Sequence, residues 1–328
     1  MANFVNNIEY GPDHVFEVMS TSHEGTHTAG FALKSDIAKL QFKDLEHGMT
    51  LKDKTIIKKI NKNNFSNKEP FYFMHMSKTS GISLQEELKD VFKDEQMFIN
   101  TVQYLNNEDM LNSKLISGHF AMYPINLFKK NNKNIHAITM VRNPVDRAIS
   151  FFIFRFKIHH FFLGIKTQMP TSRDFDLFLY EMKNLDFITN FQSRSMTSSL
   201  NTERLNLINN KYINGLIDRY QLTGEQFGNC QFLKRESNGS GWKSNLNEFD
   251  IIGTVDHREI FLNKLTNLLE KNKYDSSFKN IKKNFSNFEI QDIKRVLTKS
   301  QINKVIELNQ YDFELYDFLM TNKGVFEC

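Results

Sequence analysis

Two spacings of hydrophobic positions alternate along most of the chain and predict strands and helices in turn. Short apolar runs, of the length of buried strands, lie near residues 71–76, 97–102, 114–118, 135–141 and 249–255. Apolar residues at helical spacing lie near residues 82–93, 144–158, 173–183, 257–271 and 301–320. Strands that alternate with helices are typical of a mainly parallel sheet flanked by helices, so we predict an α/β fold. Ligands of such folds bind at the carboxyl ends of the strands.

The chain before the first predicted strand lacks this alternation. Residues 1–68 have mixed polarity and include the polar run from Lys58 to Asn67. Polar runs between patterned segments are typical of loops. We therefore expect an N-terminal extension and linker over residues 1–68 and a single domain over residues 69–328.

The first predicted strand ends at a small, basic, hydroxyl-rich turn, Ser77 to Gly81, and a helical pattern follows. A helix that starts after a strand presents N–H groups and the positive end of its dipole, which together bind anions. Lys78 adds a positive charge. The glycine that opens a nucleoside triphosphatase P-loop is missing, since Met74 to Ser77 precede the lysine. The turn therefore indicates a phosphate site that does not serve ordinary ATP hydrolysis.

A second strand-to-helix junction has the same architecture. Arg142 follows the apolar run Ile135 to Val141, and Asn143 and Pro144 suit the N-cap and first position of a helix. Arg142 can bind a phosphate through two hydrogen bonds, and Ser150, two turns into the helix, can offer a hydroxyl to the same anion. Taken alone, the junction is also compatible with a well-capped crossover.

Together the two junctions resemble those of the sulfotransferases that use 3′-phosphoadenosine 5′-phosphosulfate (PAPS), especially the carbohydrate O-sulfotransferase branch. The family pattern His-Ile-Pro-Lys-Thr-Gly-Gly-Thr-Ser-Leu holds the 5′-phosphosulfate, and His75 to Leu84 departs from it at Ser77, Ser80 and Ile82. The family pattern Arg-x-Pro-x-x-Arg-x-x-Ser holds the 3′-phosphate, and Arg142 to Ser150 matches it completely. The resemblance implies a P-loop-like sulfotransferase fold.

Weaker echoes of the same family follow in the expected order between Phe71 and Phe318. They are Gly118-His119, Asn190-x-Gln192-x-Arg194, the segment from Gly253 to Arg258, and Asp312-x-x-Leu315-Tyr316. Each pattern is degenerate, but their order extends the resemblance over most of the chain after residue 70.

The resemblance also implies the roles of individual residues. Lys78 is expected to be catalytic, because its ammonium can neutralise the charge that accumulates as the phosphate leaves. Arg142 with Ser150 is expected to select the 3′-phosphate that ATP lacks. The residues expected to bind the donor are Lys78, Thr79, Ser80, Gly81, Ile82, Ser83, Arg142 and Ser150.

His119 is the candidate general base, since a neutral imidazole is the usual base near pH 7. It follows a predicted strand, and the resembling glycan enzymes place their base at this Gly-His pair. The alternative is a histidine that caps the strand or hydrogen-bonds the nucleotide. Glu86 is the next candidate base, whereas His75 is expected to be a core histidine inside its strand.

Two other signals carry less weight. His23-Glu24-Gly25-Thr-His27 has the spacing of a helical zinc site, but its glycine and its flanking hydroxyl residues argue against a helix. Arg147, Arg155 and Lys157 are compatible with a solvated helix face, although Arg147 also fills a position of the family motif. We therefore expect no metal site.

Composition restricts the environment of the protein. The 328 residues carry a formal net charge of +4, which is too small to indicate binding to a nucleic acid polymer. Two widely spaced cysteines, Cys230 and Cys328, indicate a reducing compartment. No signal peptide is visible, and charged residues interrupt the apolar stretch from Phe151 to Ile165. We expect a cytoplasmic protein with no membrane contact, or else a trimmed part of a longer chain.

We therefore expect an enzyme that transfers a sulfuryl group in line from PAPS to a hydroxyl or amine of a small molecule, such as a secondary metabolite or alkaloid. PAP is the expected product, and no metal is required. A glycan acceptor is the alternative within this class, and a P-loop kinase or a non-catalytic nucleotide-binding module outside it. The kinase would need a glycine before Lys78 and an acidic metal ligand, and the silent module would tolerate loss of Lys78 or His119. The sequence leaves the oligomeric state open.

Overall fold

The computed structural model describes residues 15–21, 27–33, 55–58, 68–100, 107–162, 169–183, 188–198, 238–275, 278 and 288–328. The strands are β1 (Val15–Thr21), β2 (His27–Leu33), β3 (Thr55–Lys58), β4 (Phe71–Met74), β5 (Met97–Asn100), β6 (Leu115–Gly118), β7 (His136–Val141), β8 (Ile251–Thr254) and β9 (Val325–Glu327). The α-helices are α4 (Gly81–Val91), α5 (Asn107–Leu111), α6 (Tyr123–Lys130), α7 (Pro144–Phe162), α8 (Ser172–Lys183), α9 (Phe191–Thr197), α13 (Arg258–Lys271), α14 (Ile290–Val296), α15 (Lys299–Leu308) and α16 (Gln310–Thr321). Two 3-10 helices span Ser240–Glu248 and Val255–His257.

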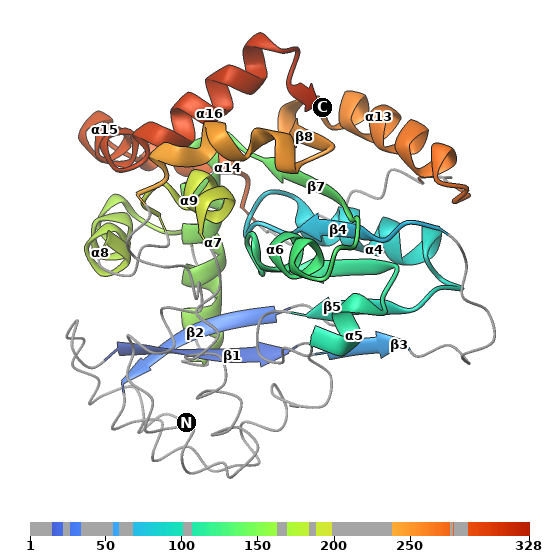
Figure 1. Ribbon diagram of the computed structural model, residues 1–328. Coiled ribbons are helices and arrows are strands. Elements are labelled where there is room, and N and C mark those ends of the chain that lie inside the picture. The colour runs from blue at the N-terminus through green and yellow to red at the C-terminus, as the bar shows by residue number, and fades with distance from the viewer. Residues whose placement is uncertain are drawn as a thin grey trace.

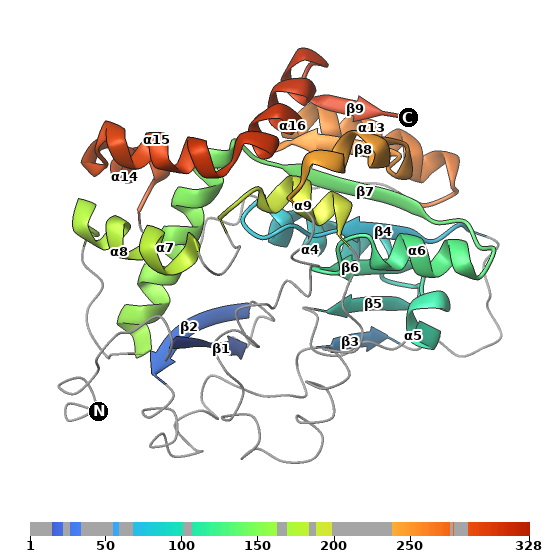
Figure 2. The ribbon, with the colours of Figure 1, turned by 60° about the vertical axis from the view of Figure 1, so that its left-hand side comes forward.

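A seven-stranded sheet forms the centre of the molecule, in the order β3-β5-β6-β4-β7-β8-β9 (Figure 2). The inner strands β5, β6, β4, β7 and β8 are parallel, and the edge strands β3 and β9 are antiparallel to their neighbours. The parallel strands are those predicted from the hydrophobic pattern, so the mainly parallel α/β fold is confirmed. The edge strands and the hairpin β1–β2 were not predicted, because short or half-polar strands lack a clear apolar run. β3 lies within residues 1–68, and the boundary at residue 68 stays a prediction.

Alternating side chains of the central strand β4 face opposite sides of the sheet. Phe71 and Phe73 pack with apolar residues of α4 and α13, and Tyr72 and Met74 pack with residues of α6 and α16. All four side chains are buried, which explains why this strand reads as a continuous apolar run rather than an alternating one. Helices therefore cover both faces of the sheet, as the sequence predicted.

A third apolar cluster joins α7, α8, α14 and α15, which lie together to the left of the sheet in Figure 1. Its centre is aromatic, with the rings of Phe152 and Phe175 in an edge-to-face contact at 5.0 Å. Because α7 begins directly after β7, this cluster stands beyond the carboxyl ends of the parallel strands. None of the described helices is long and apolar enough to cross a membrane.

The predicted single helix over residues 301–320 was wrong, because the chain breaks it at Asn309 between α15 and α16. The side chain of Asn309 is fully buried, and its Oδ1 accepts a hydrogen bond from the backbone N–H of Asn190 at 3.1 Å. A tertiary contact therefore ends the helix at a position where the periodic pattern continues.

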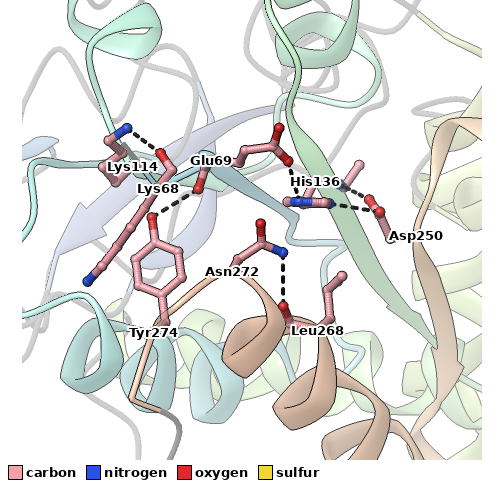
Figure 3. A network of polar contacts seen from close by, with 9 residues as sticks. Lys68, Glu69, Lys114, His136, Asp250, Leu268, Asn272 and Tyr274 are labelled. Carbon is pink, nitrogen blue, oxygen red and sulfur yellow. Dashed lines mark hydrogen bonds and ion pairs between the residues drawn. The ribbon is translucent and has the colours of Figure 1, made fainter. Parts of the chain in front are cut away.

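His136, the first residue of β7, lies between two carboxylates at the amino-terminal edge of the sheet (Figure 3). Its Nδ1 is 2.8 Å from Oδ1 of Asp250, and its Nε2 is 2.8 Å from Oε2 of Glu69. Burial by itself lowers the pKa of His136, but the hydrogen bond and charge of Asp250, with Asn272 and Glu69, raise it above its usual value. This network joins the starts of β4, β7 and β8.

Candidate active site

A tight loop connects β4 to α4 at the carboxyl edge of the sheet. Lys78 and Ser80 have left-handed backbone angles, with φ of 69° and 61°. Such angles are uncommon for residues other than glycine and concentrate at functional sites. Ser80 is the N-cap of α4 and makes no side-chain cap hydrogen bond. The first-turn N–H groups of Gly81, Ile82 and Ser83 are therefore not capped by this residue and suit an anionic ligand.

Gly81 packs directly against the imidazole of His75. A Cβ on Gly81 would lie 1.9 Å from Cδ2 of His75, so only glycine fits between the loop and this ring. The ring also stacks on Phe73 with centroids 5.6 Å apart. β4 ends at Met74, so the prediction that His75 lies inside the strand was wrong. The imidazole instead packs against the loop between β4 and α4.

The two side chains at the turn of the loop differ in accessibility. Thr79 is fully buried, and its Oγ1 donates to the carbonyl oxygen of Met76 at 2.9 Å, so its hydroxyl is already engaged within the loop. Lys78 is partly exposed, and its Nζ lies 4.4 Å from the ring centroid of Phe154 in α7. The aromatic face attracts the ammonium and holds it beside the loop.

His119 follows β6, which is a direct neighbour of β4, with Gly118 opposite Met74 in the register. Its Nδ1 is hydrogen-bonded to the carbonyl oxygen of His75. Because a carbonyl oxygen only accepts, Nδ1 carries the proton and Nε2 keeps its lone pair. Burial lowers the pKa of His119, and the hydrogen bond to His75 opposes this shift. The imidazole is therefore neutral near pH 7, as a general base must be.

Arg142 follows β7, the other neighbour of β4, and it joins the two predicted anion sites. Its Nη1 donates to the carbonyl oxygen of Lys78 at 3.4 Å. Burial lowers the pKa of Arg142, and the charges of Asp146 and Asp256 oppose that shift. Lys78, His119 and Arg142 thus follow three adjacent strands at one edge of the sheet.

The helix after Arg142 starts as the sequence predicted. α7 begins at Pro144, and Oδ1 of Asn143 accepts the N–H groups of Val145 and Asp146 at 3.0 and 3.3 Å. Ser150 is partly exposed. It lies seven residues, or about two helical turns, after Asn143 and therefore on the same face of α7 as that N-cap residue.

Comparison with known proteins agrees with this geometry. The model of the sulfotransferase domain family matches residues 16–203, which is more than half of the chain and includes Lys78, His119 and Arg142. The chain belongs to the sulfotransferase family. It is therefore a transferase, and members of this family generally use PAPS as the sulfuryl donor. No curated protein matches the chain.

The sulfotransferase buries the second arginine of its Arg-x-Pro-x-x-Arg motif. The side chain of Arg147 is 1% exposed, and its guanidinium carbon lies 4.6 Å from the ring centroid of Phe191. Burial lowers the pKa of Arg147 to about 10, and the negative charge of Asp312 opposes this shift. Arg155 is also buried. The alternative that these positions form a solvated helix face is therefore wrong for Arg147 and Arg155, and the side chain of Lys157 lies outside the described residues.

A buried hydrogen-bond network connects two of the weaker family motifs. The Asp312 carboxylate accepts the N–H groups of Gln192 and Ser193 at the start of α9, at 3.0 and 2.8 Å. In return, Oδ1 of Asn190 accepts the N–H groups of Tyr311 and Asp312 at the start of α16, at 2.9 and 3.4 Å. The sequence contained both motifs, but more than 100 residues separate them, and no local signal indicated that they meet.

The described part of the chain contains no group of three or more His, Cys, Asp or Glu side chains that could hold a metal ion. His23 and Glu24, which belong to the zinc-like spacing, lie outside the described residues. Glu86, the second candidate base, forms an ion pair with Lys89 at 2.7 Å. His119 therefore remains the better candidate for the base.

Proposed function

We propose that this sulfotransferase transfers a sulfuryl group from PAPS to a hydroxyl or amine of a small molecule and releases PAP. The observation that carries this proposal is the hydrogen bond between Arg142 and the carbonyl oxygen of Lys78. It brings a guanidinium beside a loop that already suits a phosphate, so the site has two neighbouring places for anions. PAPS has a 5′-phosphosulfate and a 3′-phosphate to fill both, whereas ATP lacks the second.

The residues present fit this donor. Lys78 and the backbone N–H groups of Thr79, Ser80, Gly81, Ile82 and Ser83 would hold the 5′-phosphosulfate. Arg142 and the hydroxyl of Ser150 would hold the 3′-phosphate. The fit is supported by the left-handed turn and the N-cap that lacks a side-chain hydrogen bond.

The donor supplies an activated sulfuryl group, which leaves the 5′-phosphate oxygen and joins the acceptor oxygen or nitrogen. His119 takes the acceptor's proton on Nε2, the nitrogen that the bond to His75 leaves unprotonated. Lys78 neutralises the charge that accumulates on the phosphate oxygen. Loss of one such preorganised donor costs about 3 kcal/mol of transition-state stabilisation.

We further propose that the acceptor is a small soluble molecule, such as a secondary metabolite or alkaloid, and that the protein is cytoplasmic. The free and exposed thiol of Cys328 supports a reducing compartment. A glycan acceptor is the second candidate, and the Gly118-His119 pair favours it because it resembles the base position of glycan enzymes. A direct assay of acceptors distinguishes a small-molecule acceptor from a glycan acceptor.

The donor proposal is tested by thermal unfolding with PAP, AMP or ADP. PAP should raise the unfolding temperature far more than the other two, because ligand binding to the folded state stabilises it. Arg142→Ala should weaken PAP binding by about 2–5 kcal/mol while AMP binding changes little. Equal shifts with all three nucleotides would contradict the proposal.

The transfer itself is tested by incubating the protein with labelled PAPS and panels of metabolites and oligosaccharides. Mass spectrometry should detect an added sulfate on a small molecule, and sulfation confined to oligosaccharides would favour the second candidate. The reaction should proceed in excess EDTA, because Lys78 and Arg142 supply the positive charge. A full requirement for a divalent ion would favour phosphoryl-transfer chemistry instead.

A further inference from the structure

The side-chain amide of Gln192 forms hydrogen bonds with both backbone polar groups of Arg142, its N–H and its carbonyl oxygen. The N–H of Arg142 donates to Oε1 of Gln192 at 2.7 Å, and Nε2 of Gln192 donates to the carbonyl oxygen of Arg142 at 2.9 Å. Gln192 is fully buried. The amide therefore takes the place of a strand neighbour at the point where β7 has ended and the chain turns into α7.

The helix that carries Gln192 is itself fixed from the interior. The N–H of Gln192 donates to the buried carboxylate of Asp312, and Asn190 accepts N–H groups of α16 in return. α9 lies under α16 in both views of the ribbon (Figures 1 and 2). Gln192 thus connects α16 to Arg142, the residue after β7, through hydrogen bonds.

The side chain of Arg142 has a weaker support of its own. Its Nη1 reaches the carbonyl oxygen of Lys78 at 3.4 Å, near the upper limit for a hydrogen bond. An arginine whose backbone is already in place loses less conformational entropy on binding a phosphate than one whose backbone must also be ordered. The two short bonds from Gln192 therefore fix the point in the backbone from which the side chain of Arg142 extends.

We propose that Gln192 is a positioning residue that sets the selectivity of this site for a 3′-phosphate through the backbone of Arg142. The inference rests on the proposed function. Glutamine is the residue type that this place requires, because a buried N–H and a buried carbonyl need one acceptor and one donor on the same planar group. Methionine provides neither at similar volume, and an ionised glutamate provides only the acceptor.

The test measures dissociation constants of PAP and AMP by calorimetry for the wild type, Gln192→Met and Gln192→Glu. Gln192→Met should weaken PAP binding about tenfold to a hundredfold, because two backbone groups of Arg142 lose their partners. AMP binding should change less than about twofold, since AMP has no 3′-phosphate. Equal losses for PAP and AMP would show a purely structural role and overturn the inference.

Gln192→Glu provides a readout that general destabilisation would not move. A protonated carboxyl group both accepts and donates a hydrogen bond, as the glutamine amide does. The ratio of PAP affinity to AMP affinity in Gln192→Glu should therefore rise toward the wild-type ratio, measured at the same pH, as the pH falls. A ratio that stays at the wild-type value, or one that does not depend on pH, would overturn the proposal. This variant decides the question if Gln192→Met does not fold.

Ser193→Ala is the matched control. Ser193 follows Gln192 in α9, and its Oγ donates to Asp312 at 2.7 Å but makes no hydrogen bond with Arg142. Its loss should lower stability and leave the PAP to AMP ratio unchanged. If the wild type itself binds PAP and AMP equally, the proposed function fails, and the inference fails with it.

Discussion

The carbonyl oxygen of His75 accepts a hydrogen bond from Nδ1 of His119, and the two imidazole rings lie 4.6 Å apart. His75 therefore makes two contacts in the site, one through its ring and one through its carbonyl oxygen. Its ring packs against Gly81 in the loop between β4 and α4, and its carbonyl fixes the tautomer of the candidate base His119. His75 therefore contacts both the loop and the candidate base.

The pH dependence of turnover should report His119. Burial lowers its pKa from the usual value of about 6.5, so kcat should fall in acid only below about pH 6.5. His119→Ala should lower kcat roughly 10²–10⁴-fold and leave PAP binding nearly intact. His136→Gln, at the opposite edge of the sheet, is the control and should keep the wild-type kcat. Normal turnover in His119→Ala would move the base to another residue.

Lys78 should act mainly on the transition state. Lys78→Ala should lower kcat roughly 10²–10³-fold, because the charge on the departing oxygen loses its closest cation. The KM for PAPS should change much less, which steady-state kinetics would show. Lys93→Ala, an exposed lysine just after α4, should behave as wild type. A large rise in KM with an unchanged kcat would instead assign Lys78 to ground-state binding.

Asp312 should be important for stability, because it caps α9 and lies near the buried charge of Arg147. Asp312→Ala should lower the free energy of unfolding by about 3–5 kcal/mol, since the buried N–H groups of Gln192 and Ser193 then lose their acceptor. Chemical denaturation would measure this loss. Asp312→Asn should lose less, because its amide oxygen still accepts a backbone N–H.

Glu314→Ala is the control for Asp312, because Glu314 is exposed on the same helix. Its free energy of unfolding should stay within about 0.5 kcal/mol of wild type. If Asp312→Ala were as mild, the buried network would contribute little to stability.

The network at His136 should make stability depend on pH. Its pKa in the folded state is raised above the unfolded value of about 6.5, so the ion pairs stabilise the fold fully below that value. This contribution is lost as the pH rises through the folded pKa. His136→Gln should therefore cost about 1 kcal/mol more near pH 6 than near pH 9, as measured by urea denaturation. The charge of Asp250 is needed for this difference, so Asp250→Asn should reduce it; an equal cost at both pH values would contradict the assignment.

Much of the fold could be predicted because it depends on short stretches of sequence. The buried strand before His75, the turn at Lys78 and the helix capped by Asn143 all follow from residues within a few positions of each other. The edge strands β3 and β9 could not be predicted in this way. They are three or four residues long, and their pairing partner rather than their own pattern makes them strands.

The candidate site was predictable only in part. The sequence indicated Lys78, His119 and Arg142, and the structure brings the ends of their strands together. The sequence could not indicate that Arg147 is buried. A helical pattern by itself suggests that an arginine is solvated, whereas in the structure Arg147 packs against Phe191 and lies near the charge of Asp312.

By itself the sequence determined which segments become strands and helices and which carry anion-binding residues, because local periodicity and capping decide these. The tertiary structure decided which segments meet. Gln192 reaches Arg142 across 50 residues and Asp312 across 120, since α9 packs between β7 and α16. The order of the strands places β6 and β7 on either side of β4 and so brings His119 and Arg142 to the loop of Lys78. Pairing between strands depends on contacts distant in sequence, and no short window of residues contains that information.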